Sequence, residues 1–469
     1  EDSLVRSSSY TRESGPVERF NRSKKQERRE RNLQYQDAKF AAHAAGSTTF
    51  MGTIGTMSLK YPDGRWDLKA LAAKTLQSAG FATEFPADVK AQVADIMAKT
   101  RPAEGVYVLP DDAKKPYVRD MRDKPFVSID NGTLWTKMDS EELAKNPEAN
   151  VSSRDIDQLQ FTEDLPDGSK KVFVAVSDLD AFVKKDSPID RFMDVNTSSI
   201  YTPDKVFNLV PNELAEDLVS LNPREERLAN VVEYTVSPEG NVKEFDIYPA
   251  LVKSRVKLDY SSTAAFLNGE TEASPAMRMA GPEVIADIKR QAEASASLEK
   301  SADRRGMVEV DRSEARIITE NGNAVDVEFS KKNVATETVE NFMINSNSLV
   351  SQYLRSKNLP TLERALPVPD DKNWNKIRNL AQQNGFSLPS KPDSGALSRY
   401  LNDVREADPE KADENIIAAM RLVGRAEYVA VWPGDELPGH FMLGLDNYMQ
   451  STASIRRGGD RVTSRMLAV

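Results

Sequence analysis

The pattern of apolar and polar positions divides the chain into a helical start, a strand-rich middle and a helical end. Apolar side chains recur at helical spacing over residues 67–79, Gly80 ends that segment, and Pro86 opens a second predicted helix that runs to residue 99. Apolar runs then predict strands at residues 125–130, 171–176, 230–236 and 245–257. Helical patterns return at residues 336–355 and 414–424. Strands followed by helices predict an α+β fold.

Composition narrows the class of protein. The 469 residues are enough for two or three domains. The chain has no cysteine, which excludes disulfides and thiolate metal sites, and its two histidines, His43 and His440, argue against a zinc site or a histidine-based triad. No apolar run approaches the roughly 20 residues that span a bilayer, and no signal-peptide pattern is visible. We therefore expect a protein of the cytoplasm or another reducing compartment.

The charge distribution leaves room for a nucleic-acid ligand. The formal net charge of −10 is not typical of a nucleic-acid-binding protein. Two segments are nevertheless basic: residues 18–31 carry seven basic and three acidic side chains, and residues 455–465 carry four basic and one acidic. An acidic outer surface around a basic channel would reconcile these facts, although the first segment could also be ordinary solvated charge.

Three aspartates carry the first indication of chemistry. Asp130 ends an apolar run, which is the pattern of a buried strand with a carboxylate at its end. Asp155 and Asp157 are two residues apart, so their side chains point to the same face if their segment is extended. Carboxylates gathered in this way repel one another unless a divalent cation neutralises them, and oxygen ligands suit Mg²⁺. Such clusters usually serve phosphodiester chemistry. The alternative is that these acids only cap loops.

Six collinear segments surround this cluster and extend its interpretation. They are RDMRDKPFVSID from residue 119, SRDIDQ from 153, KVFVAVSDLDAFV from 171, IYTPDK from 200, HFMLGLDNY from 440 and SIRRGGDR from 454. In order and spacing they resemble the catalytic domain of the RNB-type exoribonucleases, the ribonuclease II and ribonuclease R family. The resemblance covers about three quarters of the chain.

The resemblance implies a site and a reaction. Asp130, Asp155 and Asp157 would hold Mg²⁺, with Mn²⁺ as a possible substitute, and position water for attack on the last phosphodiester, releasing 5′-monophosphates from the 3′ end. Gln158 stands where the family has a fourth aspartate, which removes one negative charge and weakens metal binding. Asp178 is a nearby acid that could partly compensate, or could be structural.

The resemblance also implies contacts to RNA. Tyr201 matches an aromatic residue that stacks on a base near the 3′ end, although tyrosine is also a common core residue. Arg456 and Arg457 match arginines that grip the terminal phosphates, and a guanidinium can stabilise transition-state charge. The family prefers proline at Ser454 and an aromatic residue at Gly458, and we expect Gly458 and the following glycine to loosen the segment. For His440 we expect a packing role.

These expectations divide the chain into three parts. We predict a basic flexible arm over residues 1–48, a small helical module with a linker over 49–118, and an RNB-like catalytic domain over 119–469, with a surface insertion at 131–154. The helical module is interpreted either as a winged-helix-like domain or as an entry segment packed on the catalytic domain. The β-barrel RNA-binding domains that usually flank the family's catalytic region are not expected here.

The function predicted from the sequence is a magnesium-dependent 3′→5′ exoribonuclease that acts on single-stranded RNA. The second hypothesis, of another class, is a catalytically weakened RNB-like protein that serves as an RNA-binding or assembly component, which Gln158 and Gly458 favour. A DNA nuclease or a phosphatase that uses the same acids is a third option.

Overall fold

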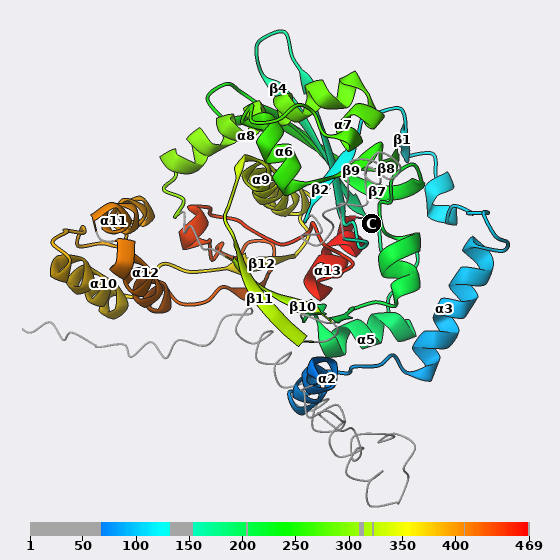
Figure 1. Cartoon of the computed structure of the whole chain (residues 1–469), viewed down its shortest axis with the longest axis horizontal. Helices are drawn as coiled ribbons and strands as arrows, with labels where there is room; N and C mark the ends of the chain where they lie inside the picture. Colours follow the sequence, from blue (N-terminus) through cyan, green and yellow to red (C-terminus); the bar gives the residue numbers. More distant parts are fainter. Residues whose placement is uncertain are drawn as a thin grey trace, which may run out of the picture.

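The computed structural model describes residues 67–131, 153–202, 205–308, 314–320, 323–407 and 409–467. The predicted basic arm and most of the predicted insertion at 131–154 lie outside these residues. Figure 1 shows a central twisted sheet with helices on its flanks and a group of three helices at the left edge. Among the described helices, none combines the length and the apolar character needed to cross a bilayer.

The central sheet has seven strands in the order β1-β8-β7-β4-β3-β2-β9. Its inner strands β8, β7, β4, β3 and β2 pair antiparallel, whereas β1 joins β8 and β9 joins β2 in parallel. The strands are β1 (Arg119–Met121), β2 (Val127–Asp130), β3 (Gln158–Asp164), β4 (Lys170–Ser177), β7 (Glu226–Val236), β8 (Val242–Lys253) and β9 (Val256–Asp259).

Helices cover one face of this sheet because its strands alternate in the usual period of two. In β4, Val172, Val174 and Val176 pack with residues of the two long helices α8 (Pro282–Arg304) and α9 (Val334–Ser356). Phe173 and Ala175 alternate with them and belong to the apolar cluster on the other face. Asn333 and Thr336 form a capping box that begins α9.

Smaller elements complete the described chain. The helices are α2 (Leu68–Ser78), α3 (Ala87–Thr100), α5 (Pro188–Asn196), α6 (Tyr260–Leu267), α7 (Pro275–Ala280) and α13 (Gly458–Leu467), with the short turns η1 (Asp111–Lys114) and η3 (Phe441–Leu443) and the π-helix η2 (Glu213–Leu218). Three two-stranded pairs join β5 (Ile200–Tyr201) to β6 (Val206–Phe207), β10 (Glu314–Glu320) to β11 (Asn323–Ser330), and β12 (Thr361–Ala365) to β13 (Glu427–Val431).

The first described helices pack on the rest of the chain. Val89 and Val93 of α3 share a buried apolar cluster with Ile189 and Met193 of α5 and with Ile455. The amide of Asn196 also bonds both backbone groups of Ala82, in the loop between α2 and α3. These contacts favour the interpretation of this region as an entry segment, and the division of the chain into three parts stays a prediction.

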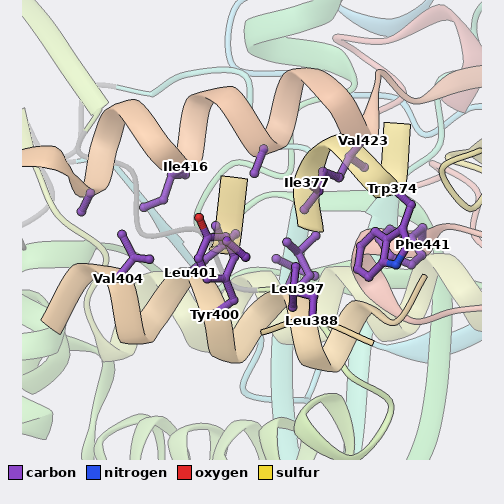
Figure 2. Packing of buried hydrophobic residues seen from close by; sticks show 14 of the residues in the cluster. Trp374, Ile377, Leu388, Leu397, Tyr400, Leu401, Val404, Ile416, Val423 and Phe441 are labelled. Carbon is purple, nitrogen blue, oxygen red and sulfur yellow. The ribbon is translucent and has the colours of Figure 1, made fainter. Parts of the chain in front are cut away.

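A three-helix group lies between β12 and β13 in the sequence. It consists of α10 (Asp371–Gln383), α11 (Ser394–Ala407) and α12 (Pro409–Val423). Figure 2 shows its own apolar core, in which Trp374 and Ile377 of α10 meet Leu397 and Leu401 of α11 and Ile416 of α12. The sequence pattern predicted only part of α12. The predicted α+β class is confirmed: the fold is a mixed α+β architecture around a seven-stranded mixed sheet.

A buried carboxylate joins the sheet to α8. Asp287 accepts hydrogen bonds from the backbone N–H and the hydroxyl of Thr162 in β3, at 2.8 and 2.7 Å, and from the Gln291 amide at 2.7 Å. Burial raises the pKa of Asp287 from 3.8 to about 6, although its hydrogen bonds act in the opposite direction. The other amide atom of Gln291, Oε1, is buried without a partner.

Replacing Asp287 by asparagine should change how stability depends on pH. The folded carboxyl binds its proton more tightly than the unfolded one, so its contribution to stability is complete below pH 3.8 and is lost as the pH rises through about 6. Asp287→Asn removes that loss, and rotation of the Gln291 amide lets Oε1 accept a hydrogen bond from the new N–H group. We expect the variant to exceed the wild type by about 1–3 kcal/mol in unfolding free energy at neutral pH.

Urea unfolding at about pH 4.5 and pH 8 measures this difference, because the two values bracket the folded pKa. Asp164→Asn, at an exposed end of the same strand, is the control. A variant that is less stable than the wild type by the same amount at both pH values would contradict the account.

Candidate active site

Asp130 lies at the carboxyl end of β2, beside a second acid, Asp259, which the sequence analysis did not predict to be there. Its strand runs parallel to β9, and the register pairs Asp130 with Asp259, so two acids end adjacent strands. Asp130 accepts a hydrogen bond from the N–H of Asn131 at 2.7 Å. Burial raises the pKa of Asp130 above its ordinary value, and the positive charge of Arg456 acts against this rise. The carboxylate of Asp259 accepts a hydrogen bond from the N–H of Ser262 at the start of α6, at 2.8 Å.

A serine from a distant turn fixes the segment that carries Asp155 and Asp157. The hydroxyl of Ser220 accepts from the N–H of Ile156 at 3.0 Å and donates to the carbonyl of Arg154 at 2.6 Å. The N–H of Leu221 donates to the carbonyl of Ile156 at 2.9 Å. These three hydrogen bonds hold the backbone on both sides of Asp155, although this segment is not part of the sheet. They explain how a loop can keep two acids in fixed positions.

Asp157 is the most enclosed of the three acids, with 1% of its surface exposed. Its Oδ1 accepts from the N–H of Ile455 at 3.0 Å and from the hydroxyl of Ser177 at 3.3 Å, and its Oδ2 accepts from Nε of Arg456 at 2.6 Å. Burial raises the pKa of Asp157 to about 6, and the charge of Arg456 lowers it in part. Both oxygens are thus already engaged by the chain.

Arg456 is the positive charge that the three acids share. Burial lowers the pKa of its guanidinium, but the negative charges of Asp157, Asp155 and Asp130 outweigh that effect and raise the pKa above its ordinary value. Its side chain remains about 30% exposed, so donors other than Nε can reach a ligand. One guanidinium thus lies within the electrostatic influence of three carboxylates, near the place where β2 ends and β3 begins.

Tyr201 completes this group from a separate segment. Its hydroxyl donates to Oδ2 of Asp155 at 2.6 Å, while 54% of the residue stays exposed. Burial of the hydroxyl and the charge of Asp155 raise the pKa of Tyr201 above its ordinary value. The chain before Tyr201 runs beside the arginines, since the N–H of Ser199 donates to the carbonyl of Arg456 at 2.9 Å. The ring is therefore not a core residue.

Arg457 and Gln158 occupy different surroundings from Arg456 and Asp157. The guanidinium of Arg457 donates to Oδ2 of Asp460 at 2.7 Å, one turn into α13. Gln158 pairs across the sheet with Val176, whose side chain packs toward α9, whereas Asp157 contacts the next residue, Ser177. The sheet thus places Gln158 and Asp157 on opposite faces.

The segment before Arg456 is held closely, contrary to the expected loosening. Ser454 donates to the carbonyl of Ser177 at 2.9 Å, a bond that proline could not make. A Cβ at Gly458 would lie 3.2 Å from the carbonyl of Thr197, and one at Gly459 would lie 3.1 Å from the ring of Tyr428. The two glycines allow close approach of neighbouring segments.

Five charged residues, which we call the α13 anchor, attach α13 to the loop after β4 and to α5. Arg461 contacts Asp190 at 2.8 Å and Asp194 at 2.9 Å, and Arg465 contacts Asp180 at 2.7 Å and Asp190 at 3.0 Å. The anchor fixes the helix that directly follows the arginines. Sequence patterns do not indicate this anchor, because its partners lie about 270 to 290 residues apart.

Two further candidates from the sequence have structural partners. The carboxylate of Asp178 accepts from the N–H of Asp180 at 3.0 Å and from the hydroxyl of Ser464 at 3.3 Å, and burial raises its pKa to about 6. His440 caps η3 through the N–H of Leu443 at 3.3 Å, and burial lowers its pKa to about 4, which leaves the ring neutral at pH 7. Both roles are consistent with packing and attachment.

The three acids suit a hard divalent cation by chemistry, because carboxylate oxygens are the ligands that such cations prefer. In the part of the chain that the structure describes, no three acidic or histidine side chains stand close enough to form a metal site as they are arranged. Protein donors hold both oxygens of Asp157 and one oxygen of Asp155. The residues therefore fit a cation by chemistry, once these donors release the oxygens.

Comparisons with known proteins identify the family of this chain. A family model described as RNB domain matches residues 149–469. Ribonuclease R of Thermotoga maritima is 27% identical over 391 residues, which are 82% of this chain and 49% of that protein. The chain spans less than half the length of the curated relatives it matches.

Solved structures share the fold. RNase R of Mycoplasma genitalium aligns with a TM-score of 0.72 at 22% identity, over 86% of this chain and 57% of that chain, and it has also been solved with ribose-methylated single-stranded RNA and with double-stranded RNA. Yeast Ssd1, a pseudonuclease, aligns with a TM-score of 0.54 at 16% identity, over 81% of this chain and 45% of that chain. Because the RNB family model matches well over half of the residues, the chain belongs to the RNB domain exoribonuclease family and is similar to ribonuclease R.

Proposed function

We propose that this protein is a divalent-metal-dependent 3′→5′ exoribonuclease that acts on single-stranded RNA and releases 5′-monophosphates. The observation that carries the proposal is a pair of short hydrogen bonds, from Tyr201 to Asp155 and from Arg456 to Asp157, near the end of the strand that carries Asp130. Family membership supports it, and Mg²⁺ is the metal that enzymes of this family generally use.

Each residue has a role that its surroundings support. Tyr201 exposes an aromatic ring, which can stack on any base and so suits RNA of any sequence. The Arg456 side chain is about 30% exposed, and a guanidinium fork can bind the oxygens of the last phosphate and stabilise charge that develops on them. Ile455 and Ser177 hold Asp157 in one orientation through Oδ1.

The acids would hold the metal ion. When bound there, Mg²⁺ supplies a Lewis acid and lowers the pKa of water, which the carboxylates alone cannot do. Asp130 and Asp155 are the two acids with the fewest protein donors on their oxygens, so they are the first candidates for ligands. The buried Asp157 holds Arg456 through Oδ2, and it would join Asp130 and Asp155 as a ligand only when Arg456 releases that oxygen.

A catalytically weakened, RNA-binding protein is the second candidate. It is favoured by the neutral side chain of Gln158, which lies on the opposite face of the sheet from Asp157, and by the engagement of both oxygens of Asp157 with the chain. The similarity to Ssd1 concerns the fold alone, so it does not distinguish between the two functions. One assay on the same RNA separates them.

Incubation of the protein with 5′-labelled oligoadenylate and Mg²⁺ or Mn²⁺ should give a ladder of shortened products, and EDTA should abolish it. Asp155→Asn should reduce the rate by at least about a hundredfold, because the amide keeps the shape but loses the charge that attracts the cation. Asp164→Asn, an exposed acid outside the site, is the control and should act like the wild type. RNA binding without any shortening would support the second candidate.

Gln158→Asp should leave the rate of shortening within about twofold of the wild type, because the strand register puts residue 158 on the face of the sheet opposite Asp157, away from the other acids. The sequence alone favoured a gain of about tenfold, or about 1.4 kcal/mol in the barrier, from a fourth carboxylate at the metal. Gln158→Asn is the matched control, since it has the same size as aspartate without the charge. A rate about tenfold higher for the aspartate variant than for the asparagine variant would contradict this placement and return position 158 to the metal site.

The α13 anchor should affect turnover more than RNA affinity. Arg465→Gln removes the ion pairs with Asp180 and Asp190, so α13 and the preceding Arg456 lose a fixed position relative to the acids. We expect kcat to fall by about tenfold with a small change in KM, because displacement of a catalytic group acts on the reacting geometry. Arg465→Lys keeps the charge and should restore most of the rate.

Thermal unfolding of both variants shows whether either change acts only on stability. If the lysine variant is as slow as the glutamine variant although both stay folded at the assay temperature, charge at position 465 does not position Arg456.

A further inference from the structure

Two hydrogen bonds join the residues that face RNA to the acids that face a cation. The hydroxyl of Tyr201 donates to Oδ2 of Asp155, and Nε of Arg456 donates to Oδ2 of Asp157, both at 2.6 Å. These are charge-assisted bonds of short length, and they occupy oxygens that a metal ion would need. RNA that binds Tyr201 and Arg456 therefore changes which oxygens of Asp155 and Asp157 are free for a cation.

The contacts differ in how readily they can open. Tyr201 is 54% exposed and sits on β5, a strand of two residues that pairs only with β6. The N–H of Ser199 donates to the backbone carbonyl of Arg456, so a change of partner at Arg456 would be confined to its side chain. Asp157 keeps two donors on Oδ1 when Oδ2 changes partner, so the carboxylate stays in its orientation.

Resting on the proposed function, we propose that Tyr201 and Arg456 form a latch across Asp155 and Asp157 that the 3′ end of RNA opens. When the ring of Tyr201 stacks on a base and Arg456 turns to a phosphate, Oδ2 of each acid becomes free for a divalent cation. RNA and the cation then bind cooperatively, and the cation binds weakly to the protein alone. The protein assembles its metal site on the end of its substrate.

This latch predicts how strongly the binding of RNA and the binding of the cation affect each other at equilibrium. A cation that binds without RNA must break the bond between Tyr201 and Asp155, whereas a cation that binds after RNA does not. A coupling of this kind is reciprocal, so RNA must tighten the cation by the same factor by which the cation tightens RNA. Removal of the Tyr201 hydroxyl must raise the affinity of the RNA-free protein for the cation and reduce the coupling factor.

Manganese titration, followed by electron paramagnetic resonance of the free ion, measures this affinity without any turnover. We expect Tyr201→Phe to bind Mn²⁺ about three- to tenfold more tightly than the wild type in the absence of RNA, the range that corresponds to one net hydrogen bond. Tyr117→Phe, which removes a hydroxyl from another exposed tyrosine (61% exposed), should leave the affinity unchanged. Phenylalanine keeps the stacking ring, so RNA binding remains possible in the variant.

A second titration contains a saturating 2′-O-methyl oligoadenylate as the RNA probe. The probe should tighten Mn²⁺ for the wild type, and for Tyr201→Phe the tightening should be smaller by the same three- to tenfold factor. Equal Mn²⁺ affinities for wild type and Tyr201→Phe would overturn the latch, as would the absence of Mn²⁺ binding to both proteins.

The result separates the latch from the proposed reaction. A protein that shows these shifts but shortens no RNA has the latch without the nuclease activity. A protein that shortens RNA but whose Mn²⁺ affinity does not change in Tyr201→Phe has the activity without the latch.

Discussion

The ion pair between Arg456 and Asp157 is the contact on which the rest of the site depends. The Asp157 side chain is fully buried, the Arg456 side chain is about 30% exposed, and Nε and Oδ2 are 2.6 Å apart. Removal of one partner from such a pair leaves an uncompensated charge and costs about 3–5 kcal/mol, whereas an apolar replacement of both is often neutral. Stability alone therefore does not explain why the pair is built in.

The surrounding structure can be understood as what holds this pair in position. Ser177 and Ile455 orient the carboxylate from one side, and Ser220 fixes the loop that carries it. On the arginine side, Ser454 ties the chain to the end of β4, and the α13 anchor fixes the helix that follows. The sheet, the turn after η2 and α13 are thus joined around a single ion pair.

The sequence predicted the local parts of this arrangement well. Helical and alternating patterns placed α2, α3, α9, β2, β4, β7 and β8, but they missed β3, α8, α10 and α11. The apolar run before Asp130 correctly indicated a strand that ends in an acid. Collinear motifs nominated Tyr201 and Arg456, which do meet the acids. Local periodicity could not predict that Asp259 ends the strand next to Asp130, that Gln158 and Asp157 lie on opposite faces, or that Ser454 and the glycines hold the arginine segment closely. Each of these depends on strand register or on a contact between residues far apart in the chain.

A crystal structure of the protein with Mn²⁺ and a 2′-O-methyl oligoadenylate would test the central claim most directly, because anomalous scattering locates the metal independently of the chain. The account predicts a manganese peak in contact with carboxylate oxygens of Asp130 and Asp155, with Arg456 turned toward the last phosphate and the ring of Tyr201 against a base. A manganese peak outside these acids, or an RNA 3′ end that binds away from Arg456, would contradict it.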